Sequence, residues 1–105
     1  MKISENNRNM TIAFQGEFDN YTITQIKQEC IDLIEEKKPK KVCLDFKEVS
    51  FIDSTGIGFI LGRYKQCSRM NCELTLRNLS RQHRSLLAMS GLFQLISEER
   101  DEGVL

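Results

Sequence analysis

The side chains best suited to chemistry gather in one short stretch, Asp53-Ser54-Thr55-Gly56, between an apolar segment and an amphipathic one. The pattern places Ser54 at or beside the N-terminus of a helix, where unpaired backbone N–H groups and the helix dipole favour negative charge. A serine hydroxyl there caps the helix, and a phosphate on the same oxygen would lie in an anion-binding position. Ser54 is therefore either a cap alone or a cap that is also a phosphorylation site.

A hydrolytic serine is a weaker interpretation of the same residue. The nucleophile motif G-x-S-x-G is incomplete, because Ile52 stands at the position of its first glycine. The one histidine, His83, lies between polar residues and is expected on an exposed helix face. We therefore expect no catalytic residues.

Three glycines follow Ser54 in the pattern Gly56-x-Gly58-x-x-x-Gly62. This spacing is one residue longer than the dinucleotide fingerprint G-x-G-x-x-G, so a small nucleotide- or ligand-binding enzyme remains only an alternative. The four cysteines form no C-x-x-C pair and are expected to be free, buried thiols. We predict no cofactor and no metal site.

The helix after Ser54 has an apolar stripe at helical spacing, which should face the core. Its members are Ile57, Ile60, Leu61, Tyr64 and Ser68. Gly58 and Gly62 lie off this stripe, and so does Phe59, beside Arg63. Since glycine inside a helix costs about 1 kcal/mol relative to alanine, we expect a close approach or an open face there. We predict that these off-stripe residues bind a partner; the alternative is that Phe59 packs beneath the segment 16–21.

Alternating hydrophobicity predicts a first strand from Met10, which Gly16 breaks. A helix follows, with Thr22 as its cap and Gln25 at the reciprocal position. Further strands are expected over 42–46 and 73–77. These elements alternate along the chain, which indicates an α/β fold in one domain, with a mixed sheet of about four strands packed with helices.

The C-terminal part should hold a helix capped by Ser80 and stopped by Gly91. Its inward-facing residues are expected to be Leu86, Leu87 and Met89. A short strand or turn then covers 93–96, and 97–105 is an acidic tail that could begin a helix. The expected core of the domain, 1–105, therefore spans about 10–96.

The composition excludes several classes of partner. The 105 residues carry 15 Lys and Arg against 15 Asp and Glu, so bulk electrostatic binding to nucleic acid or an anionic membrane is not expected. No apolar run has the length of a membrane span, and the N-terminus lacks the apolar core of a signal peptide. We expect a soluble, cytoplasmic protein.

The stretch F-I-D-S-T-G-I-G at 51–58 resembles the phosphorylation motif of bacterial anti-sigma factor antagonists, single-domain proteins of the STAS type. The stretches 60–66 and 89–93 are most similar to the sporulation members, which antagonise anti-sigma-F factors. The segment from Gly16 to Asp19 is similar to the first-loop pattern of the family. The resemblance extends from about Met10 to Ile96, beyond which the last helix of the family looks shortened.

The resemblance implies a switch protein without enzymatic activity. Its unphosphorylated form would bind an anti-sigma factor that is also a serine kinase, phosphorylation at Ser54 would end that binding, and a PP2C-type phosphatase would reverse it. Thr55 is a minor alternative acceptor. Loops at one end of an α/β sheet converge, so the partner surface should also include Glu17, Asp19, Asn20, Asp53 and Thr55. We expect a monomer or weak dimer, with a STAS subunit of a stress-sensing scaffold as a further alternative.

Overall fold

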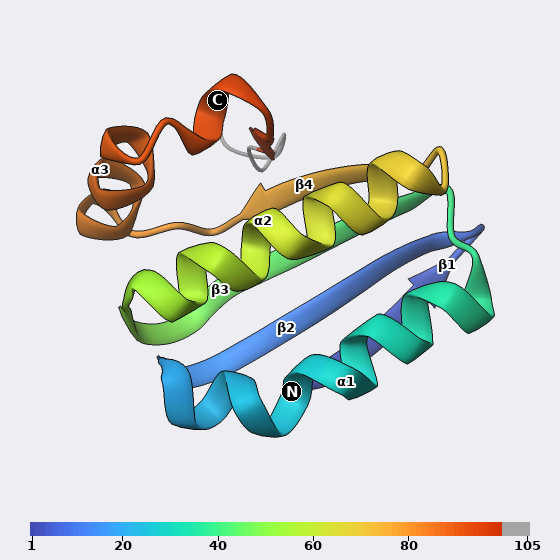
Figure 1. Cartoon of the computed structure of the whole chain (residues 1–105), viewed down its shortest axis with the longest axis horizontal. Coiled ribbons are helices and arrows are strands. Elements are labelled where there is room, and N and C mark those ends of the chain that lie inside the picture. The colour runs from blue at the N-terminus through green and yellow to red at the C-terminus, as the bar shows by residue number, and fades with distance from the viewer. Residues whose placement is uncertain (100–105) are drawn as a thin grey trace.

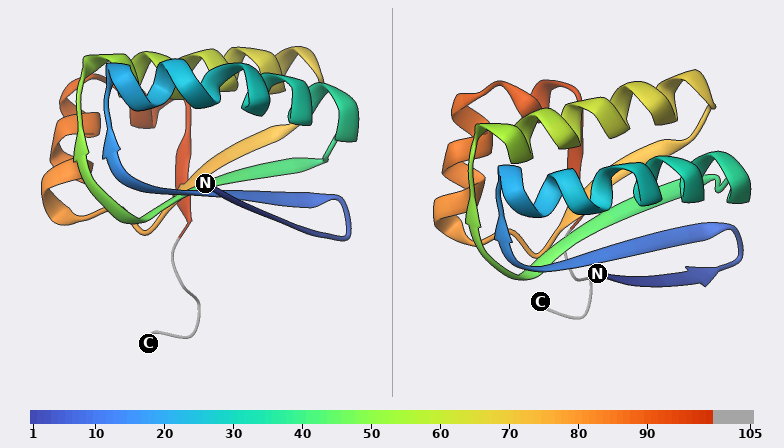
Figure 2. Two further views of the ribbon diagram at one scale, coloured as in Figure 1. Left: turned by 90° about the horizontal axis from the view of Figure 1, so that it is seen from below. Right: turned by 60° about the horizontal axis from the view of Figure 1, so that its bottom comes forward.

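The computed structural model describes residues 1–99 as one mixed sheet with helices on one face (Figures 1 and 2). The strands are β1 (Lys2–Asn6), β2 (Asn9–Phe18), β3 (Lys41–Ile52), β4 (Glu73–Arg77) and β5 (Ser97–Glu99), in that spatial order. The helices are α1 (Asn20–Lys37), α2 (Ser54–Arg69), α3 (Arg81–Met89) and the 3₁₀ turn η1 (Leu92–Gln94). The α/β class predicted from the sequence is confirmed.

The sheet topology determines where the helices begin. β1 and β2 form an antiparallel hairpin, whereas β2, β3, β4 and β5 are parallel neighbours. α1 follows β2 and α2 follows β3, and the two helices lie side by side across the same face of the sheet (Figure 2). Because β2 and β3 are adjacent and parallel, the N-termini of α1 and α2 meet at one end of the molecule.

The core lies between this helical layer and the sheet. In β2, Met10, Ile12 and Phe14 are buried and alternate with more exposed residues, as the period of a strand requires. Ile23, Cys30 and Ile34 face them from α1. Burial of this apolar surface is the main source of stability for a domain of this size.

Cysteines contribute to the core as free thiols. All four are buried and unpaired, as expected from the sequence. Burial raises the pKa of Cys30 to about 11 and that of Cys67 to about 12, so these side chains stay protonated near neutral pH. Within the described residues, no helix is both long and apolar enough to cross a membrane.

Within residues 1–99 the sheet is already larger than predicted, with five strands in place of about four. The predicted core of 10–96 is therefore too short at both ends, because β1 precedes it and β5 follows it. Every residue of β1 is exposed, so that strand lacks the alternation that would reveal it. Ser97–Glu99 forms a strand, whereas residues 100–105 of the predicted acidic tail lie outside the described part of the chain.

The first strand also continues past its predicted break. Gly16 adopts φ of +80° at an irregularity in the β2–β3 pairing, and β2 continues to Phe18. A glycine with positive φ thus forms a bulge here instead of ending the strand. α1 then begins at Asn20 with Asp19 as its cap, so the prediction that Thr22 caps it is wrong.

The last helix confirms its predicted cap but not its predicted faces. Ser80 Oγ accepts a hydrogen bond from the backbone N–H of His83, at 3.1 Å. Leu87 is buried as expected, but Leu86 and Met89 are exposed and His83 is buried. The short helix buries one narrow stripe, which consists of His83 and Leu87 at positions i and i+4. The polar neighbours of His83 in the sequence predicted that its side chain is exposed, and that prediction is wrong.

Candidate functional site

The candidate site lies where the parallel strands β2 and β3 end side by side. Phe18 and Ile52 are paired at this end, and the backbone N–H of Asp53 donates to the carbonyl of Phe18 at 3.4 Å. The chain enters α1 from one strand and α2 from the other. Residues that follow the two strands are therefore neighbours, although more than thirty positions separate Asn20 from Asp53 in the sequence.

Asp53 joins the two helix N-termini. Its Oδ1 accepts a hydrogen bond from the backbone N–H of Gly56 at 3.0 Å and thereby caps α2. Its Oδ2 accepts one from the backbone N–H of Asn20, the first residue of α1, at 3.3 Å. One carboxylate therefore satisfies unpaired donors of both helices, which is a favourable arrangement for a negative charge.

Asp19 caps the neighbouring helix in the same way. Its Oδ1 accepts a hydrogen bond from the backbone N–H of Thr22 at 3.0 Å. That backbone hydrogen bond holds the pKa of Asp19 below its ordinary value of 3.8. Asp19 and Asn20 thus lie at the same end of the sheet as Asp53, as the sequence predicted, and Glu17 pairs with Phe51 of β3 just before them.

Ser54 does not cap α2, because the cap is Asp53. Ser54 is the first residue of the helix and is exposed. Its hydroxyl makes no hydrogen bond to any residue of the described chain. The hydroxyl is therefore free to accept a group from solvent, next to a helix N-terminus that favours negative charge.

Phe59 is a core residue, so the prediction that it lies on an exposed partner-binding face is wrong. It is 4% exposed, and its ring centroid lies 5.4 Å from that of Phe18 and 5.8 Å from that of Phe14. The buried stripe of α2 therefore includes Phe59, Ile60 and Cys67, while the predicted stripe member Ser68 is exposed.

Gly56 explains this rotation of the helix. A Cβ atom at Gly56 would lie 2.7 Å from the carbonyl oxygen of Phe18 and 2.7 Å from its ring. Only glycine permits this approach of α2 to the end of β2. The close contact turns the face that begins with Gly56 and continues through Phe59 toward the sheet, a constraint that apolar spacing alone does not reveal.

Gly58 and Gly62 are different, since a Cβ atom at either position would meet nothing within 4 Å. Their predicted position on an open face is confirmed. They border a hollow of about 360 Å³ between α1 and α2, together with Thr55. Lys27 of α1 also borders this hollow. The sequence did not predict Lys27 as a site residue, because a single lysine on a polar helix face does not indicate a binding site.

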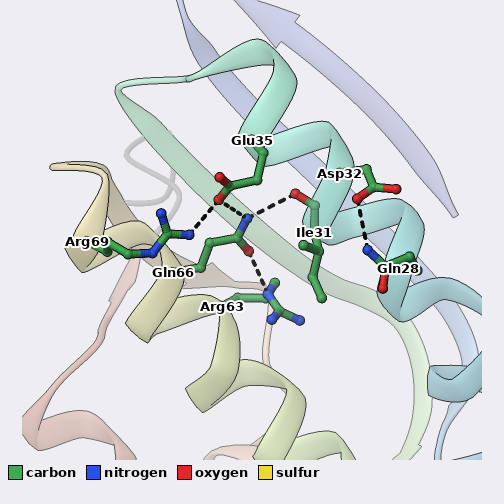
Figure 3. Close-up of polar contacts among 7 residues, drawn as sticks. All are labelled: Gln28, Ile31, Asp32, Glu35, Arg63, Gln66 and Arg69. Carbon is green, nitrogen blue, oxygen red and sulfur yellow. Dashed lines mark hydrogen bonds and ion pairs between the residues drawn. The ribbon is translucent and has the colours of Figure 1, made fainter.

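Arg63 borders the same hollow but is 6% exposed, which contradicts its predicted position on an exposed face. Its Nε donates to Gln66 Oε1 at 2.9 Å, and its guanidinium lies over the ring of Phe59, 5.1 Å from the centroid. Gln66 in turn donates to the carbonyl oxygen of Ile31 and to Glu35, which connects the two helices (Figure 3). Arg63 is thus held in one orientation.

Comparison with known proteins assigns this architecture to a family. The model of the STAS domain family matches residues 1–103. The chain belongs to the STAS domain family. This assignment agrees with the resemblance in the sequence and with the observed mixed sheet.

Two relatives of this STAS domain are named as anti-sigma factor antagonists. It is 31% identical over 87 residues to an anti-sigma F factor antagonist from Paenibacillus polymyxa, covering 83% of this chain and 74% of that protein. It is 30% identical over 94 residues to an anti-sigma-B factor antagonist from Bacillus subtilis, covering 90% and 84%. Relatives named for both sigma-F and sigma-B are therefore similar to it.

A solved structure supports the same assignment. The anti-sigma factor antagonist SpoIIAA in its unphosphorylated form superposes with a TM-score of 0.82 at 25% identity, covering 97% of this chain and 90% of that one. The likeness therefore extends over nearly the whole STAS domain.

Proposed function

We propose that this STAS domain is an anti-sigma factor antagonist whose binding is switched by phosphorylation at Ser54. The observation that carries the proposal is the exposed, unengaged hydroxyl of Ser54 beside a helix N-terminus that Asp53 already caps. The names of its relatives, antagonists of anti-sigma F and anti-sigma-B factors, support the same function. In this proposal the chain is a binding module and not a catalyst, and it acts in the cytoplasm.

The proposed partner is an anti-sigma factor that is also a serine kinase. In its unphosphorylated form the STAS domain binds this partner through the end of the sheet that carries Ser54, and the sigma factor is released. The kinase transfers a phosphate to Ser54, the complex separates, and a PP2C-type phosphatase restores the first form. The rest of the proposed contact surface is formed at this end by Glu17, Asp19, Asn20, Asp53 and Thr55, and on the open face of α2 by Gly58 and Gly62.

The switch requires only a change in charge. A phosphate on Ser54 adds about −1.5 to −2 charges at neutral pH. Asp53 precedes Ser54 in the chain and Asp19 lies at the same end of the sheet, and both already use their carboxylates as helix caps. A partner docked on this surface would have to bury the phosphate dianion beside them, and a penalty of about 4 kcal/mol would weaken binding roughly a thousandfold.

The fold of the STAS domain need not change on phosphorylation. The N-terminus of α2 accommodates negative charge, and the cap that holds the helix belongs to Asp53 and not to the modified side chain. We therefore expect the phosphorylated and unphosphorylated forms to share one backbone arrangement, with the difference confined to the binding surface.

The alternative of a nucleotide-binding enzyme fits the structure less well. A glycine-rich phosphate loop presents free backbone N–H groups to the phosphates. Here the N–H of Gly56 is already bonded to Asp53, and Gly58 and Gly62 lie within the body of α2 instead of in a loop. A carboxylate thus occupies the position where such an enzyme would hold a phosphate.

The test uses two substitutions with opposite expected effects. Ser54→Ala should bind the kinase but accept no phosphate, whereas Ser54→Asp should fold normally and bind poorly. Ser68→Asp is the matched control, since Ser68 is also exposed on α2 but lies near its other end. Mass spectrometry after incubation with kinase and ATP identifies the modified residue. Phosphate on Thr55 alone, or on neither residue, would overturn the assignment.

A further inference from the structure

The hollow between α1 and α2 contains a charge without a counterpart. Arg63 is 6% exposed, and the Nη1 atom of its guanidinium is buried without a hydrogen-bond partner in the described chain. Burial lowers the pKa of Arg63, and no carboxylate within residues 1–99 forms an ion pair with it. Because a buried cation costs free energy unless it is paired, an anion bound beside Arg63 would offset that cost.

The nearby carboxylate of Glu35 does not pair with Arg63. Glu35 Oε2 accepts hydrogen bonds from Gln66 at 2.8 Å and from Arg69 at 2.7 Å, so the carboxylate is shared by these two donors (Figure 3). Gln66 then presents its oxygen to Arg63 Nε. The network therefore orients the guanidinium of Arg63, whereas its carboxylate, Glu35, forms an ion pair with Arg69. Arg63 thus remains available to another anion.

The walls of the hollow suit a small anion. Lys27 adds a second positive charge, Thr55 adds a hydroxyl, and none of the described residues that border it is acidic. Gly58 and Gly62 keep the space open, since a side chain at either position would extend into it. Glycine is unfavourable inside a helix, so two glycines facing open space indicate that the space itself is used.

We propose that this hollow binds a small oxyanion, a carboxylate or phosphate group held by Arg63 and Lys27 between the two helices. The guanidinium has the planar donor arrangement that matches such groups, and Gln66 holds it in position. The proposal goes beyond the switch at Ser54 and does not depend on it. Its test uses the isolated chain without any partner, so the anion site and the phosphorylation switch can each be contradicted without the other.

The test is an NMR titration of backbone amides with sodium phosphate and, separately, with sodium acetate. We expect saturable shifts at Thr55, Gly58 and Gly62 with at least one of these anions, and the effective one identifies the class of oxyanion. Sodium chloride at equal ionic strength is the control for salt. The absence of saturation with both anions, or the same shifts in chloride, would overturn the proposal.

Matched variants test the assigned residues. Arg63→Met removes the guanidinium and Gly62→Leu fills the hollow, and each should weaken binding about tenfold or more, because charge-assisted hydrogen bonds or the space for them are lost. Lys65→Met removes an exposed cation of the same helix that does not border the hollow, and it should change the affinity by less than about twofold. If Arg63→Met does not fold, Gly62→Leu still tests whether the anion binds in the hollow. Unchanged affinity in Gly62→Leu would overturn the proposed location.

Discussion

Asp53 Oδ2 lies 3.3 Å from the backbone nitrogen of Asn20, so the carboxylate that caps α2 also accepts a hydrogen bond from the first residue of α1. This contact ties together two helices whose starting points are far apart in the sequence. It also separates two roles within the motif Asp53-Ser54, because the aspartate stabilises the fold and the serine remains free for modification.

The first prediction follows from this division of roles. Asp53→Ala should lower the free energy of unfolding by about 1–2 kcal/mol, because α2 loses its cap. Ser54→Ala should change it by less than about 0.5 kcal/mol, since Ser54 is exposed and caps nothing. Urea unfolding of both variants measures the difference, and a larger loss for Ser54→Ala would contradict the assignment of the cap.

A second prediction concerns Phe59. Phe59→Ala should lower the free energy of unfolding by about 3–5 kcal/mol, because it leaves a cavity among the rings of Phe14 and Phe18. Tyr21→Ala is the control, since Tyr21 is an aromatic residue near the same end of the molecule but is 75% exposed. Similar thermal melts for the two variants would show that Phe59 is not in the core.

The third prediction compares two glycines of one helix. Gly56→Ala should destabilise the protein, because its Cβ would lie 2.7 Å from the carbonyl oxygen of Phe18. Gly58→Ala should stabilise it by about 1 kcal/mol, because the new methyl group meets open space and alanine favours the helix. Chemical denaturation distinguishes the two, and effects of the same sign would contradict the packing described for α2.

The sequence was sufficient for the parts of the fold that depend on local patterns. The strand over 73–77 and the helix after Ser54 have clear periodicity, and both occur as predicted. β1 could not be predicted in this way, because all its residues are exposed and its pairing to β2 is a tertiary property. Local patterns reveal elements with one buried face and miss elements without one.

The site shows the same limit. Asp53 and Ser54 are both good cap residues, so the sequence could not decide which one caps α2. The predicted apolar stripe of α2 does face the core at Ile60, and Ile57, Leu61 and Tyr64 pack at its edge. The most buried face also includes Phe59, which the sequence could not reveal because it depends on the contact of Gly56 with Phe18. Arg63 was expected in solvent, since charged residues are seldom buried, and its burial depends on Gln66 and Phe59.

A fourth prediction concerns acid stability. The hydrogen bond from Thr22 lowers the pKa of Asp19 in the folded state below 3.8, so Asp19 stabilises the fold above that pH and loses this contribution as the pH falls through the folded pKa. Asp19→Asn removes this titration but keeps a side chain that can cap a helix. The free energy of unfolding, measured between about pH 5 and pH 2, should therefore fall less in Asp19→Asn than in the chain that keeps Asp19. Identical pH dependence would contradict this role of Asp19.

The central claim is that a phosphate on Ser54 ends binding to the anti-sigma kinase. Its most direct test is the dissociation constant for that kinase, measured by calorimetry with purified chain in unphosphorylated form and with chain phosphorylated at Ser54. We expect binding to be weaker by about a thousandfold in the phosphorylated form, because the interface would bury a dianion beside Asp53. Equal affinity of the two forms would contradict the claim.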